Sequence, residues 1–165
     1  MLNSYIILEG GTWDGNSDDN IDYGTTANIH FHGVDFVWVN RVRSLNGVSE
    51  GIKVRNSQRC WITNNYVYRS KLEFPGGDRT GKAGITSSRI AHEVIVTGNI
   101  VEDSGGEGIG IHTNIDRVVI ANNVVRYIAK GRCYILVEGS SSTSADFARD
   151  VLIVNNAVYA NHQCL

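Results

Sequence analysis

Ile62-Thr63-Asn64-Asn65-Tyr66-Val67 is one copy of a short motif in which apolar residues lead into Asn and then into another apolar pair. Further copies read Val-Thr-Gly-Asn-Ile-Val at 96–101, Ile-Ala-Asn-Asn-Val-Val at 120–125 and Ile-Val-Asn-Asn-Ala-Val at 153–158. Two degenerate copies align with these, VWVNRV at 37–42 and LEGGTW at 8–13. A motif that returns at this scale predicts a repeat architecture.

The second Asn of each copy provides a marker for the repeat. The markers are Asn40, Asn65, Asn99, Asn123 and Asn156. Two of the intervals contain an insertion, at 71–82 and at 139–149, and without them the repeat is about 24 residues long. Asn tolerates the left-handed backbone region that a sharp bend needs, and stacked copies would pair their side-chain amides into a ladder. We therefore expect the markers to be structural.

A second motif precedes each marker, for example Glu-Gly-Ile-Lys-Val-Arg at 50–55 and Glu-Gly-Ile-Gly-Ile-His at 107–112. Its apolar residues alternate with polar ones, which predicts a strand. We call it the first strand of the repeat and the segment before the marker the second strand. The predicted inward rows are Ile29, Ile52, Ile85, Ile109, Ile135 and Phe31, Val54, Ser87, Ile111, Val137. The predicted outward rows are His30, Lys53, Thr86, Gly110, Leu136 and His32, Arg55, Ser88, His112, Glu138.

This pattern of strand, turn, second strand, Asn turn and third strand resembles the right-handed parallel β-helix of the pectate-lyase-like superfamily. The resemblance covers the chain from about Tyr5 to His162 and implies an all-β fold of about six coils with an Asn ladder. We expect one domain over residues 1–165, either complete or part of a longer solenoid. The fold alone does not define a function, because it hosts lyases, hydrolases, epimerases and non-enzymatic fibres.

Composition excludes several classes of partner. The chain has 165 residues and a formal net charge of −2, which argues against a nucleic-acid-binding protein. No apolar run has the length of a membrane span, so we expect no membrane insertion. The N-terminal residues show no secretory signal, and an extracellular location follows only from analogy with the superfamily. The localisation stays open.

The resemblance implies a polysaccharide groove on the first-strand face, with the two insertions as its walls. The candidate catalytic residues are Lys53, Arg55, Glu107 and His112. The candidate substrate-binding residues are His30, His32, Ser88, Asp103 and Glu138. For a uronate polymer these residues suggest β-elimination, in which Arg55 binds the substrate carboxylate and His112 or Lys53 removes the neighbouring proton.

Whether the chain is an enzyme is left open by the sequence. Residues 49–57 resemble the basic strand of alginate- and chondroitin-type lyases, but the calcium-site acids and a second arginine are missing. The signatures of alginate epimerases and of polygalacturonases are absent too. A hydrolase would need two carboxylates about 5–5.5 Å or about 6.5–9.5 Å apart, for which Asp103 with Glu107 and Glu107 with Glu138 are candidates. The alternative is a non-catalytic module for assembly or adhesion, on whose surface these side chains form a hydrogen-bonded ladder.

One outward row of the second strand is entirely apolar. It comprises Ile7, Phe36, Trp61, Ile95, Val119 and Leu152. A row of this length on the surface is typical of an interface, and we expect a homo-oligomer that forms through it. The ends of the repeat show no capping helix, so the chain is predicted to be a fragment or to cover its ends by association.

We expect no cofactor and no metal. Residues 14–20 begin like a calcium loop, but the sixth-position Gly and the closing Glu are missing, so a turn rich in Asp and Asn is favoured. Cys60 is predicted to be an inward apolar residue. Cys133 and Cys164 are either joined by a disulfide or separate thiols.

Overall fold

The computed structural model describes residues 4–16, 27–70, 82–128, 133–139 and 148–159. These residues form fifteen β-strands and no helix. The strands belong to two sheets whose pairings are all parallel. The all-β prediction and the parallel arrangement are therefore confirmed.

The larger sheet contains both the first and the second strands of the repeat. It consists of β1 (Tyr5–Glu9), β3 (Ile29–His32), β4 (Phe36–Asn40), β6 (Ile52–Thr63), β8 (Ile85–Thr97), β10 (Ile109–His112), β11 (Ile115–Ala121), β13 (Ile135–Glu138) and β14 (Ala148–Val154). β6 and β8 are long enough to include both segments, so β6 pairs with β3 and with β4.

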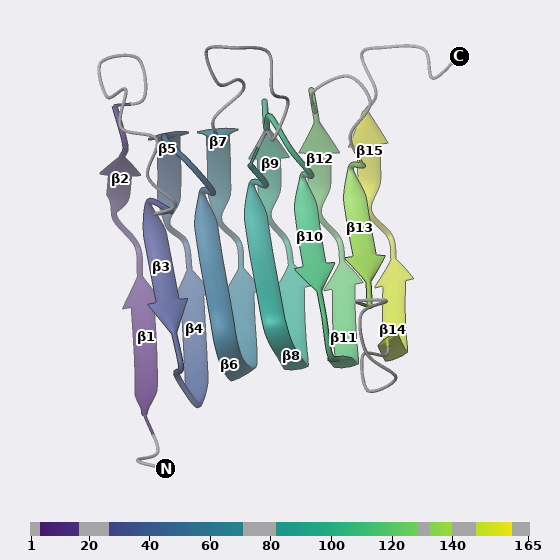
Figure 1. The fold of residues 1–165 in the computed structure, drawn as a ribbon. Helices are drawn as coiled ribbons and strands as arrows, with labels where there is room; N and C mark the ends of the chain where they lie inside the picture. The colour runs from purple at the N-terminus through teal and green to yellow at the C-terminus, as the bar shows by residue number, and fades with distance from the viewer. Residues whose placement is uncertain (1–3, 17–26, 71–81, 129–132, 140–147, 160–165) are drawn as a thin grey trace, which may run out of the picture.

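The smaller sheet contains the third strands. It consists of β2 (Thr12–Asp14), β5 (Arg43–Gly47), β7 (Tyr66–Ser70), β9 (Ile100–Glu102), β12 (Val124–Arg126) and β15 (Ala157–Tyr159). Along both sheets each repeat pairs with the next, so the strands follow one another in chain order from β1 and β2 to β14 and β15 (Figure 1).

The interior is built from the predicted inward rows. Ile52, Ile85 and Ile109 are aligned in register and are completely buried. Rows of Val and Ile from the second and third strands face them, including Ile62 and Val67, which are also fully buried. The β-branched residues that favour strands thus also supply the apolar surface whose burial stabilises the fold.

A glycine precedes the first strands in β6, β8 and β10, and its lack of a side chain allows this close packing. A Cβ on Gly84 would lie 2.3 Å from Cγ1 of Val101 on the third strand, and a Cβ on Gly108 would lie 2.2 Å from Cγ1 of Val125. A Cβ at either position would force its neighbours to shift, because real Cβ contacts are essentially never so short. The Gly-Ile pair of these repeats is therefore favoured by packing.

The two adjacent Asn residues of the motif have different roles. The first position has positive φ, from 55° to 69°, in Gly10, Arg41, Asn64, Gly98, Asn122 and Asn155. The second position forms the predicted ladder. In it, Asn65 Nδ2 donates to Asn99 Oδ1, Asn99 Nδ2 to Asn123 Oδ1, and Asn123 Nδ2 to Asn156 Oδ1, at 2.9–3.0 Å. The sequence interpretation had assigned the bend and the ladder to one residue.

One marker was misaligned. The ladder position of its repeat is Val42, whose backbone N–H donates to Asn65 Oδ1, and not Asn40. Asn40 lies two residues earlier, is paired with Thr63 and donates its side-chain amide to Glu9 Oε2. The predicted outward apolar row of the second strands changes in the same repeat. Its member in β4 is Trp38 and not Phe36, because Trp38 is the strand partner of Trp61.

Candidate functional site

The first-strand face is the outer surface of β3, β6, β8, β10 and β13. The strand register aligns the two predicted outward rows on this face without a shift. The second of these rows contains His32, Arg55, Ser88, His112 and Glu138 at consecutive strand positions. Because neighbouring strands lie about 4.8 Å apart, Arg55 and His112 are separated by about 10 Å across the sheet.

His112 is oriented by a carboxylate. Its Nδ1 lies 3.0 Å from Glu138 Oε1 on the adjacent strand. A carboxylate accepts hydrogen bonds, so a neutral His112 donates from Nδ1 and keeps a lone pair on Nε2. The position of a Cβ on Gly110 lies 2.5 Å from this Nε2, so the ring lies over the glycine and directs Nε2 back along the strand. This is the arrangement that a general base needs.

Arg55 lies at the end of the first segment of β6, just before the bulge between Arg55 and Ser57. Its side chain is half-buried, and within the described part of the chain no carboxylate and no other acceptor contacts the guanidinium. A guanidinium in this state can bind a ligand carboxylate through two parallel hydrogen bonds.

Lys53 has a partner that the sequence interpretation did not include. Its Nζ lies 2.7 Å from Glu50 Oε1, and Ser49 Oγ donates to Glu50 Oε2 at 2.5 Å. Burial would raise the pKa of Glu50, but the hydrogen bonds from Lys53 and Ser49 outweigh it, and the pKa is lowered. Since this ion pair requires a protonated lysine, Lys53 is arranged as a cation rather than as the base.

His30 and His32 are exposed at the β3 end of the face. Their rings are stacked with centroids 6.3 Å apart. Burial and the positive charge of Lys53 lower the pKa of His30. The side-chain amide nitrogen of Asn56 lies 2.9 Å from His32 Nε2. Both rings therefore present exposed polar surfaces beside Lys53 and Arg55.

The middle of the face carries only small side chains. Thr86, Ser88 and Gly110 lie between the basic residues of β6 and the His112–Glu138 pair. The side chains on both sides can therefore reach a common ligand above β8 and β10. Ser88 lies between Arg55 and His112 in the row.

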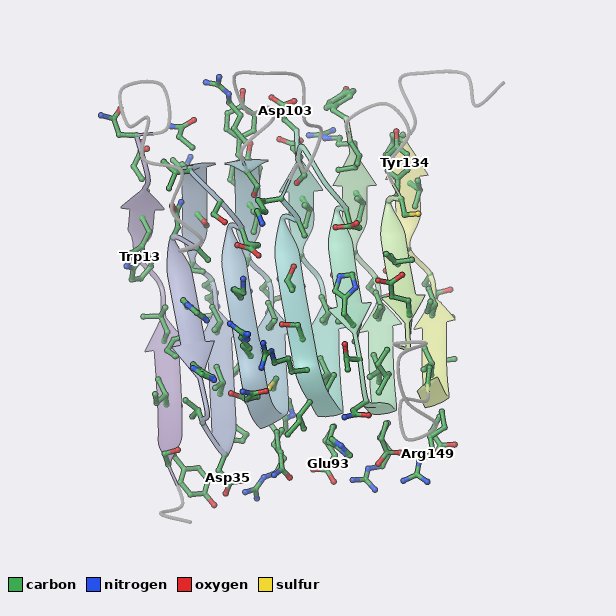
Figure 2. The ribbon with its side chains drawn as sticks, in the orientation of Figure 1. Trp13, Asp35, Glu93, Asp103, Tyr134 and Arg149 are labelled. Carbon is green, nitrogen blue, oxygen red and sulfur yellow. The ribbon has the colours of Figure 1, made fainter. Side chains whose placement is uncertain are left out.

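Glu107 and Asp103 lie elsewhere. Glu107 lies two residues before β10, whose other end is His112, the strand partner of Glu138. Asp103 lies at the opposite edge of the molecule from Glu93 (Figure 2). Burial raises the pKa of Asp103, and the charge of Arg69, whose Nε lies 4.0 Å away, offsets this rise only in part.

The expected walls of the face fall mostly outside the described residues. Of the insertion at 71–82 only Lys82 is described, and of the insertion at 139–149 only Gly139, Ala148 and Arg149 are described. Arg149 belongs to β14, where its Nε donates to Asp116 Oδ1 at 2.9 Å.

The calcium-like segment is described only as far as Asn16. Asp14 Oδ1 accepts from the Asn16 backbone N–H at 3.0 Å, which is the hydrogen bond of an Asx turn. This bond, together with that from Asn46, lowers the pKa of Asp14. Among the described residues, no group of three or more His, Cys, Asp or Glu side chains could hold a metal ion.

Cys60 is the buried apolar residue that the sequence predicted, and burial raises its pKa to about 12. Cys133 is an exposed free thiol, and Cys164 lies outside the described residues. The part of the chain that the structure describes contains no helix that is long and apolar enough to cross a membrane.

Sequence reasoning missed three buried carboxylates, Glu50, Glu102 and Asp116. Glu50 lies two residues before β6, where strand alternation gives no signal for its contact with Lys53. Asp116 is the second residue of β11, just after the bend that follows β10, and Arg149, His92 and Arg117 contact it at 2.9–3.4 Å. These contacts, the Arg149 hydrogen bond above all, lower its pKa despite burial.

Comparison with protein-family models, with curated proteins and with solved structures finds no match to this chain.

Proposed function

We propose that the chain is a right-handed parallel β-helix of about six coils, related to the pectate-lyase-like superfamily. Three observations support this proposal. The two sheets are parallel and are shared by successive repeats, residues with positive φ turn the chain between strands, and buried Asn amides are stacked along one turn. The same proposal makes the first-strand face the place where a polymer would bind, because the superfamily uses that face.

We further propose that the first-strand face binds an acidic polysaccharide that contains uronate units. The observation that carries this proposal is the Arg55 guanidinium, which has no partner within the described residues and shares a row with His112 and Glu138. Cationic and neutral nitrogen groups predominate in the β3 and β6 part of the face. An anionic carboxylate is the ligand that such a guanidinium binds best.

The geometry supports β-elimination as the reaction. Arg55 would neutralise the substrate carboxylate, which makes the neighbouring C5 proton more acidic. His112 Nε2 would take that proton, and Glu138 would stabilise the imidazolium that results. The electron pair of the C–H bond then forms the C4–C5 double bond, and the glycosidic oxygen at C4 leaves with its bonding pair and is protonated by solvent. Lys53 stays a cation beside this centre.

The test combines binding and turnover on a panel of uronate polymers. Arg55→Ala is expected to weaken binding at least tenfold, because the variant loses the carboxylate contact. His112→Gln is expected to retain binding and to lose formation of the unsaturated product, which is followed by its ultraviolet absorbance. Arg43→Ala, which removes an exposed arginine of the smaller sheet, is the matched control. Unchanged binding and turnover in both face variants would overturn the proposal.

A second candidate is a non-catalytic module for assembly or adhesion. It is favoured by the outward apolar side chains of the second strands, of which Ile7 is 60% exposed, Leu152 is 54% exposed and Trp61 is 39% exposed. This candidate predicts an oligomer at micromolar concentration and no turnover of any uronate polymer. Light scattering that gives the mass of a monomer would count against it.

A further inference from the structure

The outer surface of the second strands carries two adjacent rows. The apolar row consists of Ile7, Trp38, Trp61, Ile95, Val119 and Leu152. The charged row lies two residues before it and consists of Arg59, Glu93, Arg117 and Asp150, all with positive φ. Along four consecutive strands the sign of the charge therefore alternates.

The two rows surround an open depression of about 410 Å³. Trp61, Ile95 and Val119 form its apolar part, and Glu93, Arg117 and Asp150 form its charged part. The depression is centred on β8 and β11, with Trp61 on one side and Asp150 on the other. Glu93 lies at the lower edge of the molecule in Figure 2, the edge that also carries Asp35 and Arg149.

The side chains of both rows are held in place by their neighbours. The Trp61 ring packs edge-on against Phe36 and Trp38, with centroids 5.2 and 6.1 Å apart. Arg117 contacts Glu93 at 3.1 Å, yet both side chains remain about half exposed. A preorganised aromatic residue next to exposed charges is typical of the centre of a protein interface.

We propose that a second copy of this chain binds here, related by a two-fold axis that runs parallel to the strands between β8 and β11. Such an axis reverses the order of the strands in the second copy and leaves each row opposite itself. Ile95 of one copy then faces Val119 of the other. Glu93 faces Arg117, and Arg59 faces Asp150.

The alternating charges favour this occupant over others. A two-fold interface places the same surface on both sides, so it is stable only if the surface is self-complementary. Reversal of an alternating row of four charges pairs every charge with its opposite. A polymer of one charge sign, such as an acidic glycan, would instead meet repulsion at every second position. This proposal does not depend on the use of the first-strand face.

The first test is the mass of the whole chain by light scattering and sedimentation. We expect a dimer, and we expect Ile95→Glu to be a monomer because it buries a charge beside the axis. Leu136→Glu, an outward substitution on the first-strand face, is the matched control and is expected to remain a dimer. Circular dichroism checks that each variant is folded. A wild-type monomer at concentrations up to the millimolar range overturns the proposal.

The second test separates the interface from the stability of the fold. Glu93→Arg and Arg117→Glu each place equal charges opposite one another in a homodimer, so each variant alone is expected to be monomeric. In an equimolar mixture every pair is again of opposite sign, and a heterodimer is expected. Mixing cannot repair a misfolded chain or the lost contact between Glu93 and Arg117 within one copy. If the folded variants stay monomeric after mixing, the proposed axis is wrong.

Discussion

Strands β6 and β8 present Ile52, Val54 and Ile85 to the interior, and Lys53, Arg55 and Ser88 to the first-strand face. The inward row that contains Ile52 and Ile85 is Ile in every first strand, because each of its positions fills the same space in the interior. The outward row changes charge, size and hydrogen bonding from one strand to the next. A single strand therefore separates two tasks, because consecutive side chains point to opposite sides. Inward positions determine stability, and outward positions determine what binds.

The largest expected loss of stability from an inward position is at the Asn ladder. Asn123→Ala removes the side-chain donor to Val96 O and the acceptor of the buried Asn99 backbone N–H, which is left without this partner. We expect the free energy of unfolding to fall by about 3 kcal/mol. Asn122→Gly, one residue earlier, is exposed with a φ of 56° and should change stability by less than about 0.5 kcal/mol.

Urea unfolding monitored by circular dichroism gives both values. Equal losses in the two variants would mean that the two Asn positions of the motif do not differ in role.

The next largest expected loss of stability is at the glycine of the second motif. Gly84→Ala places a Cβ against Cγ1 of Val101, so overpacking should cost about 2 kcal/mol. Val101→Ala removes the clashing methyl group, and a double-mutant cycle should show that the two changes compensate in part. Additive losses in unfolding free energy would show that the contact is not the cause.

A pH dependence is expected from Glu50, whose buried side chain supports Lys53. Its pKa in the folded protein is lower than the usual 4.5, so its contribution to stability is present above pH 4.5 and is lost as the pH falls through the folded pKa. Glu50→Gln should therefore lose less stability than the wild type on acidification. Unfolding curves at several pH values measure how the free energy of unfolding changes with pH. The same change in the wild type and in Glu50→Gln would show that Glu50 does not cause the pH dependence.

The smallest effect distinguishes two adjacent serines. Ser87 points inward, and its buried hydroxyl has no hydrogen-bond partner among the described residues. Ser87→Ala should raise the free energy of unfolding by about 1 kcal/mol and leave ligand binding unchanged. Ser88→Ala on the outward row should leave stability unchanged and alter binding to the first-strand face. Thermal unfolding measures the stability of both variants, and a binding titration measures their ligand affinity. Altered binding in Ser87→Ala, or altered stability in Ser88→Ala, would contradict the prediction.

The sequence was sufficient for the rows of the first strand, because Ile recurs at one position in every repeat. It was misleading at Asn40 and Phe36, because Val42 replaces the ladder Asn and the nearest Asn lies two residues away. Alignment on residue identity fails where a backbone N–H can join the ladder without an Asn side chain. The pairing of Lys53 with Glu50 and the cations around Asp116 depend on side-chain directions at bends, which a period of two does not specify.

The left-handed residue at each turn has a consequence for chain length. Between β6 and β7 only Asn64 and Asn65 separate the two strands, and between β8 and β9 only Gly98 and Asn99 do so. Such a turn has no spare residues, so a strand cannot shift along its neighbour by one residue unless the next strand shifts too. The length of the turns thus fixes the register of the strands, together with the backbone hydrogen bonds. Loss or gain of a whole repeat should disturb this molecule less than loss or gain of one turn residue.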